Sequence, residues 1–235
     1  MKVLLSVSLI FLELVVFSQE KISIITEDGC ILSGYQNIIS TETPILLEFH
    51  GLGSASSEWK KFNEFAKIFK INYIAIDFRG HGESVKCKNR EIKYETMQEH
   101  DIKGFLKDID SVYKFAEKKF SKEKIIPIGA SIGANSAMEY FYKKSKKIIL
   151  MSPGLNYGGY EIADFIKNSK TKILFTVSQT DIYSLNSIKI FLEICKSQKK
   201  KCDSILVDKG HGVEIFNSAN GENYIKEILN WIISK

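Results

Sequence analysis

Short apolar runs alternate with longer amphipathic segments along most of the chain. Runs rich in β-branched and aromatic residues predict strands at 22–26, 31–36, 45–49, 73–77, 125–129, 148–151, 173–177 and 204–207. The longer segments have the spacing of amphipathic helices and lie at 96–120, 186–195 and 224–233. Helices that cross between buried strands predict an α/β fold: a mostly parallel eight-stranded sheet with helices on both faces. The first two strands follow each other directly, which predicts an antiparallel hairpin at the sheet edge.

The N-terminal end departs from this pattern. Lys2 precedes an apolar run at 3–17, and small residues follow where signal peptidase prefers to cut. We interpret residues 1–18 as an export signal. The alternatives are a retained membrane anchor or a buried first strand. Glu13 disfavours an anchor, since a charge in the middle of a span costs roughly 2.5–3.5 kcal/mol. Residues 19–235 are then one exported domain without a stable membrane span.

Composition narrows the function classes. The chain has 235 residues, enough for one well-filled core, and a formal net charge of +5. No basic stripe interleaved with aromatic residues is visible, so we expect no nucleic-acid partner. An exported chain permits disulfides, and three pairings are open to Cys30, Cys87, Cys195 and Cys202. The last two flank a predicted helix-to-strand turn and are the first pair to test. Their spacing resembles no zinc site.

The strongest chemical signal is Ser131. It follows the predicted strand 125–129, and Gly129 and Gly133 stand two residues before and after it. A helical pattern begins directly after the serine. A tight strand-to-helix turn of this kind strains the backbone, requires small neighbours and projects the hydroxyl above the sheet next to a helix N-terminus. The motif predicts a nucleophilic serine; the alternative is a glycine-rich turn.

A second loop follows the strand 45–49 and begins with His50 and Gly51. We expect it to bring the backbone N–H of Leu52 over the serine. Together with the N–H of Ile132, it would form an oxyanion hole. We interpret His50 as a structural residue that hydrogen-bonds this loop rather than as a catalytic base.

A third motif follows the strand 73–77. It is a turn that ends at Ser84. The histidine-glycine loop, this turn and the glycine-flanked serine resemble the α/β-hydrolase superfamily in order and spacing, from about residue 22 to the C-terminus. The resemblance implies that three polar residues of the turn are structural: Asp77, Arg79 and His81.

The resemblance also implies where the serine's partners lie. The acid should follow one of the last strands, and Asp181 follows the strand 173–177. The histidine should follow the final strand, and His211 is there. The order serine, aspartate, histidine is the one this fold uses. Asp208 is a rival for the acid, but it is only three residues from the histidine. His100 falls on a predicted helix surface.

These residues together predict an exported serine hydrolase that cleaves a carboxylic ester through Ser131, His211 and Asp181, with no metal or organic cofactor. The partner would be a small-molecule acyl substrate. Only residues 152–171 are left for a lid, so the site should be open and the cap minimal. A peptidase or thioesterase with the same triad, or a non-catalytic binding protein, are the alternatives. Glu48, in a central strand, needs a partner that the sequence does not name.

Overall fold

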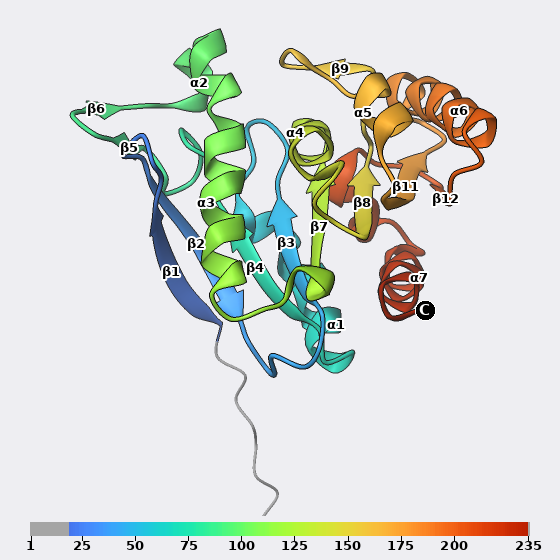
Figure 1. Cartoon of the computed structure of the whole chain (residues 1–235), viewed down its shortest axis with the longest axis horizontal. Coiled ribbons are helices and arrows are strands. Elements are labelled where there is room, and N and C mark those ends of the chain that lie inside the picture. The colour runs from blue at the N-terminus through green and yellow to red at the C-terminus, as the bar shows by residue number, and fades with distance from the viewer. Residues whose placement is uncertain (1–18, 235) are drawn as a thin grey trace, which may run out of the picture.

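One eight-stranded sheet forms the centre of the protein (Figure 1). The computed structural model describes residues 19–234, so the predicted export signal at 1–18 lies outside the described residues. The strands lie in the spatial order β1-β2-β4-β3-β7-β8-β11-β12. Their bounds are β1 (Glu20–Ile25), β2 (Ile31–Asn37), β3 (Ile45–Phe49), β4 (Asn72–Ile76), β7 (Ile125–Ala130), β8 (Lys147–Met151), β11 (Lys172–Ser178) and β12 (Cys202–Val207).

Strand direction follows the predicted pattern. β1 and β2 form the antiparallel edge hairpin, and β2 also pairs with β4 in the antiparallel direction. The pairs from β4 through β3, β7, β8 and β11 to β12 are all parallel. The predicted fold class is confirmed. The carboxyl ends of the parallel strands share one edge, where ligands of open α/β sheets bind.

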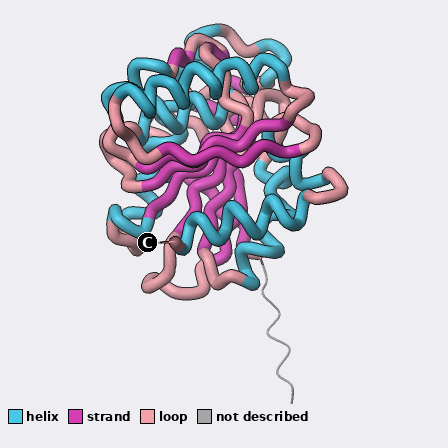
Figure 2. The backbone as a smooth tube through the Cα atoms, turned by 90° about the vertical axis from the view of Figure 1, so that its right-hand side faces the viewer, coloured by secondary structure: helices cyan, strands magenta, loops and turns pink. Residues whose placement is uncertain are grey.

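Two helical layers cover the sheet (Figure 2). On one face lie α1 (Lys60–Ile68) and α7 (Gly221–Ile233), and their buried apolar residues join one core cluster. On the other face lie α3 (Phe105–Glu117), α4 (Ile132–Phe141), α5 (Ala163–Asn168) and α6 (Ile182–Ser197), which contribute to a second cluster. The fully buried strands β3 and β4 separate the two clusters and require apolar residues on both faces.

The helix predicted at 96–120 is interrupted. It consists of α2 (Glu99–Lys103) and α3, with Gly104 between them. A Cβ atom at Gly104 would lie 2.3 Å from the Arg79 guanidinium, so a larger residue here would displace the arginine from its present position. Glycine also weakens a helix interior. The Arg79 side chain, distant in sequence, therefore accounts for the glycine at which α2 and α3 separate. Helices α6 and α7 begin earlier than predicted, at Ile182 and Gly221.

The remaining elements are short. A hairpin of β5 (Lys86–Cys87) and β6 (Arg90–Glu91) follows β4, and one of β9 (Asn156–Tyr157) and β10 (Tyr160–Glu161) follows β8. The 3-10 helices are η1 (Ser56–Trp59), η2 (Tyr94–Thr96), η3 (Lys122–Lys124) and η4 (Gly212–Asn217). The β9–β10 hairpin and α5 are all that residues 152–171 contain, so the cap is as small as the sequence predicts. Within residues 19–234, no helix is long and apolar enough to cross a membrane.

Two disulfides are present. Cys195 and Cys202 join the end of α6 to the start of β12, the pair singled out from the sequence. Cys30, directly before β2, is joined to Cys87 of the β5–β6 hairpin.

Glu48 has a partner that the sequence did not reveal. It is fully buried in β3, and its Oε2 accepts a hydrogen bond of 2.9 Å from the side-chain amide of Asn63 on α1. Burial raises the pKa of Glu48 to about 8, and the bond from Asn63 opposes this only in part. The side chain therefore enters the core as a neutral acid at neutral pH.

Candidate active site

Ser131 lies on the turn between β7 and α4. Its backbone has φ 54°, a left-handed conformation that costs a non-glycine residue free energy. Packing explains the glycines on either side. A Cβ atom at Gly129 would lie 2.4 Å from the Gly133 carbonyl oxygen, and one at Gly133 would lie 2.4 Å from the Phe49 carbonyl oxygen. Both glycines are required for α4 to begin this close to β3 and β7.

His211 and Asp181 are hydrogen-bonded to each other. The Nδ1 of His211 lies 2.7 Å from Oδ2 of Asp181, although 30 residues separate them in the chain. Asp181 caps the N-terminus of α6, where its Oδ1 accepts a bond of 3.3 Å from the Ser184 N–H. Ser152 fixes the histidine loop, because its Oγ accepts a bond of 2.9 Å from the Gly212 N–H. The strand ends of β8, β11 and β12 therefore hold the pair together.

The pKa values of His211 and Asp181 are shifted in opposite directions by their mutual hydrogen bond. The hydrogen bond to Asp181 raises the pKa of His211 above its ordinary value, while burial opposes the rise. Burial disfavours the Asp181 carboxylate, but hydrogen bonds from His211 and Ser184 outweigh it and lower the pKa of Asp181. The carboxylate is therefore ionised at neutral pH. It accepts the Nδ1 proton, which leaves Nε2 as the basic nitrogen.

Ser131 and His211 line the same cavity. It has a volume of about 370 Å³ and extends over Leu52 and the start of η4. Leu52 follows β3 and Ile132 is the first residue of α4, as the sequence predicts. Among residues 19–234, neither the Leu52 nor the Ile132 backbone N–H donates a hydrogen bond to the protein. Both donors therefore remain available near the serine.

His50 is excluded as the base by its surroundings. It is fully buried, its Nδ1 lies 2.7 Å from the Gly51 carbonyl oxygen, and its Nε2 accepts a bond of 2.9 Å from the Phe78 N–H. Burial lowers the pKa of His50 to about 3, so the ring is neutral. The histidine ties its loop to the turn after β4, which is the structural role expected from the sequence.

The turn after β4 is a network of structural hydrogen bonds. Asp77 accepts bonds of 2.7 Å from the Ser56 N–H and 2.9 Å from the Glu83 N–H. His81 is buried, and its Nδ1 lies 3.0 Å from the Arg79 carbonyl oxygen. These contacts agree with the structural roles implied by the resemblance.

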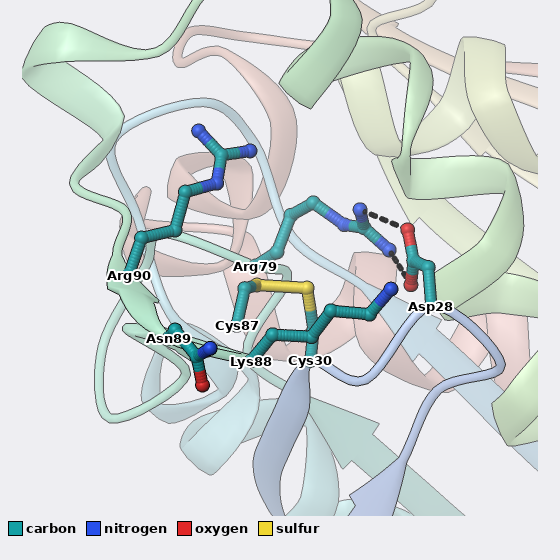
Figure 3. Close-up of a pocket in the computed structure, with 7 residues that line it drawn as sticks. All are labelled: Asp28, Cys30, Arg79, Cys87, Lys88, Asn89 and Arg90. Atoms are coloured by element: carbon teal, nitrogen blue, oxygen red, sulfur yellow. Dashed lines mark hydrogen bonds and ion pairs between the residues drawn. A yellow bond between two sulfur atoms is a disulfide. The ribbon is translucent and has the colours of Figure 1, made fainter.

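Arg79 binds two carboxylates. Its guanidinium donates to the buried Asp108 at 2.7 Å and to Asp28 at 2.8 Å. Figure 3 shows the bonds to Asp28, with the Cys30–Cys87 disulfide beside them. A second cavity, of about 430 Å³, lies here, but its lining contains neither a serine nor a histidine. Because both carboxylates bind its guanidinium, the role of Arg79 is to hold the turn in place.

The rival residues lie elsewhere. Asp208 is exposed and accepts a bond of 2.9 Å from the Asn220 side chain. His100 is exposed beside Asp101, on α2.

Two residues at the site were not fully identified from the sequence. Glu58 lines the cavity, and no motif pointed to it. Tyr157, on the β9–β10 hairpin, has its ring centre 6.2 Å from that of His211, in a T-shaped contact.

The arrangement can activate a hydroxyl and stabilise an oxyanion. A serine on a strained turn, a histidine bonded to a carboxylate, and two free backbone donors are the groups that acyl transfer requires. Within residues 19–234, no group of three or more histidine, cysteine or carboxylate side chains is placed to hold a metal ion.

Comparisons with known proteins identify the family and the fold. Residues 41–205 match the family described as serine aminopeptidase, S33. Protein phosphatase methylesterase 1 of Schizosaccharomyces pombe is 25% identical over 124 residues, which are 50% of this chain and 34% of that protein. The match thus spans about a third of that relative's length.

Solved structures show the same fold. An esterase of Pyrococcus furiosus superposes with a TM-score of 0.73 at 18% identity, over 92% of this chain and 90% of that one. The esterase RhEst1 from Rhodococcus sp. ECU1013 superposes with a TM-score of 0.72 at 13% identity, over 91% and 98%. The chain has the α/β-hydrolase fold and belongs to the serine aminopeptidase S33 family of hydrolases.

Proposed function

We propose that the protein is a serine hydrolase that cleaves carboxylic esters, with Ser131 as nucleophile, His211 as base and Asp181 as the residue that orients the base. The observation that carries the proposal is the 2.7 Å bond between His211 and Asp181 at a cavity shared with the strained Ser131. The similarity to a methylesterase and to esterase folds supports ester substrates.

The reaction follows from the positions of these groups. His211 takes the Ser131 proton as the oxygen attacks the ester carbonyl carbon, and Asp181 stabilises the imidazolium. The N–H groups of Leu52 and Ile132 stabilise the negative oxygen of the tetrahedral intermediate. The alkoxide leaves with the proton from His211. Water, deprotonated by the same histidine, then releases the acid and restores the serine.

A fluorophosphonate probe tests the proposal. It reacts with activated serines, so we expect covalent labelling of the wild-type protein and none of a folded Ser131→Ala variant. Equal labelling of both proteins would place the reactive group elsewhere. Failure to label the folded wild type would contradict the proposal and favour a non-catalytic binding protein.

A peptidase is the second candidate, because the matching family is described as a serine aminopeptidase. The same triad can cleave either bond. Turnover of p-nitrophenyl esters, thioesters and amino-acid p-nitroanilides by the purified protein separates the alternatives. A preference for the anilides above the esters would replace the ester proposal.

We also propose export, with cleavage after residue 18. The two disulfides support it, because such bonds persist mainly in oxidising compartments. Mass spectrometry of the protein from its native source should give a mature N-terminus at Gln19. A chain that retains Met1 in a reducing compartment would contradict this proposal.

A further inference from the structure

Glu58 faces the catalytic cavity from η1, the short helix that follows the loop 51–54. Its side chain lines the cavity together with Leu52, Ser131 and His211. It is only partly buried, and it belongs to none of the motifs that identify the reactive groups. A carboxyl group this close to a nucleophile and its base needs a structural or chemical reason.

The contacts of Glu58 supply that reason. Its Oε1 accepts a hydrogen bond of 3.3 Å from the Gly51 N–H, and its Oε2 accepts one from the Ser54 hydroxyl. The loop also closes on itself, with the Ser54 N–H bonded to the Gly51 carbonyl oxygen at 3.2 Å. Glu58 therefore holds the first and last residues of a four-residue loop, and Leu52 lies between them.

Leu52 cannot hold this position by its own packing. Its side chain is 53% exposed, and the next residue, Gly53, has φ +75°. Glycine permits this turn but confers no rigidity. The direction of the Leu52 N–H thus depends on the bonds at the two ends of the loop, and Glu58 supplies two of them.

We propose that Glu58 is a positioning residue that fixes the loop 51–54, so that the Leu52 N–H stays directed at the carbonyl oxygen of the substrate. The inference rests on the proposed function. Stabilisation of an oxyanion requires donors that are already in place, and removal of one donor typically costs about 100-fold to 1000-fold in turnover. A loosened donor should cost part of that amount.

Ionisation of Glu58 adds a second readout. Burial raises the pKa of Glu58 to about 7, while the bonds from Ser54 and Gly51 oppose the rise. Three charged or titratable groups surround it: Glu214 on η4, His211 beside η4 and Glu48 on β3. As a carboxylate, Glu58 accepts both bonds. A protonated carboxyl group must turn one oxygen into a donor and accepts them less well. Loop anchoring therefore strengthens as the pH rises through about 7 and weakens as it falls.

Turnover then depends on two deprotonations, of Glu58 and of His211. The wild type should show an acid limb in which log(kcat/KM) rises with pH at a slope between 1 and 2. In Glu58→Gln the slope should fall to 1. The limb should also move to lower pH, because the Glu58 charge helps to raise the pKa of His211.

Steady-state hydrolysis of p-nitrophenyl acetate tests the inference on the folded, mature protein. At pH 8, Glu58→Ala should lower kcat by about tenfold or more with KM changed less than about twofold. Glu58→Gln should recover only part of kcat, since its amide oxygen accepts one of the two bonds and its NH2 group cannot accept the other. Glu64→Ala is the matched control: Glu64 is an exposed glutamate on the adjacent α1, and its loss should change neither constant.

The outcomes separate this inference from the proposed function. A wild type that hydrolyses the ester while Glu58→Ala keeps its full kcat, or changes only KM, overturns the inference and leaves the function standing. A folded wild type with no activity on any ester overturns both. If Glu58→Ala does not fold, the Glu58→Gln pH profile decides: an acid limb unchanged in slope and position overturns the inference.

Discussion

At the scale of single residues, the candidate site depends on how burial and hydrogen bonds divide the protons between His211 and Asp181. The imidazole is raised in pKa chiefly by the carboxylate, and the carboxylate is lowered by the bonds it accepts. Both shifts favour the ion pair that forms when His211 takes the Ser131 proton. The same shift means that His211 needs a higher pH than an ordinary histidine to become the neutral base.

We therefore expect kcat/KM for ester hydrolysis to rise with pH around a midpoint above 6.5, since only neutral His211 accepts a proton. In Asp181→Asn the acceptor charge is lost. The midpoint should move down, and kcat should fall by about 1000-fold or more, because the imidazolium loses its partner. Profiles from pH 5 to 9 check this.

Asp208→Asn is the control for that experiment, because the exposed Asp208 binds Asn220 rather than His211. Its profile should match the wild type. A midpoint that stays in place in Asp181→Asn, or that moves in Asp208→Asn, would contradict the assignment of the acid.

Site residues that belong to a local sequence pattern can be predicted from the sequence. Site residues whose role depends on contacts formed only in the folded chain cannot. Ser131 is visible because its glycines stand at fixed offsets. Glu58 is not, because a glutamate in a polar loop carries no signal until that loop folds back on Gly51. The partner of Glu48 is missed for a related reason: hydrophobic spacing does not give the rotation of α1 that brings Asn63 over β3.

At the scale of elements, the eight strands agree with the predicted runs to within about two residues. The central strands are buried on both faces and give continuous apolar runs, whereas the outer strands β1, β2 and β12 are partly exposed and are marked by β-branched and aromatic residues. The helix predicted at 96–120 was wrong as one element. Apolar spacing continues through Gly104, but the Arg79 guanidinium occupies the space a side chain would need there. The hydrophobic spacing of this segment cannot indicate a contact with Arg79, which lies 25 residues earlier in the chain.

The two disulfides close loops of different length, so they should differ in their effect on stability. Cys30 and Cys87 are 57 residues apart, and Cys195 and Cys202 are 7 apart. The chain-entropy relation gives about 4 and about 2 kcal/mol respectively. Paired Cys→Ala variants, unfolded in guanidinium chloride, should lose free energy of unfolding in that order.

The single-cysteine variants are no substitute in this comparison, since each leaves a free thiol that can exchange. Equal losses from the two double variants, or a larger loss from the short loop, would show that native-state contacts rather than loop length set the contribution of each bond.

At the scale of the whole molecule, the sheet carries the reactive residues on its carboxyl edge and covers them with one small hairpin. Tyr157 of β9 stands against His211, and its hydroxyl lies 3.1 Å from the Ser184 hydroxyl. The cavity of about 370 Å³ is near the lower end of the range for small-molecule sites. The size of the cap was predictable from the spacing of the strands, but the placement of Tyr157 was not.

This geometry favours short acyl chains. We expect kcat/KM to be highest for acetyl to butyryl p-nitrophenyl esters and to fall by about tenfold or more for dodecanoyl esters, because a cavity of this size cannot enclose a long chain. A series of esters of increasing length, measured below their critical micelle concentrations, checks this. A rate that rises with length would indicate an acyl groove outside the cavity.

The strand order also bears on how the chain assembles during synthesis. The strands β1 to β4 are complete by residue 76, and they can pair with one another as soon as they emerge. The free side of β3, however, waits for β7, which begins at Ile125. For about fifty residues of synthesis the nascent protein therefore presents an apolar, unpaired strand edge of the kind that recruits other chains. Its yield in any host should depend on what shields that edge before the second half arrives.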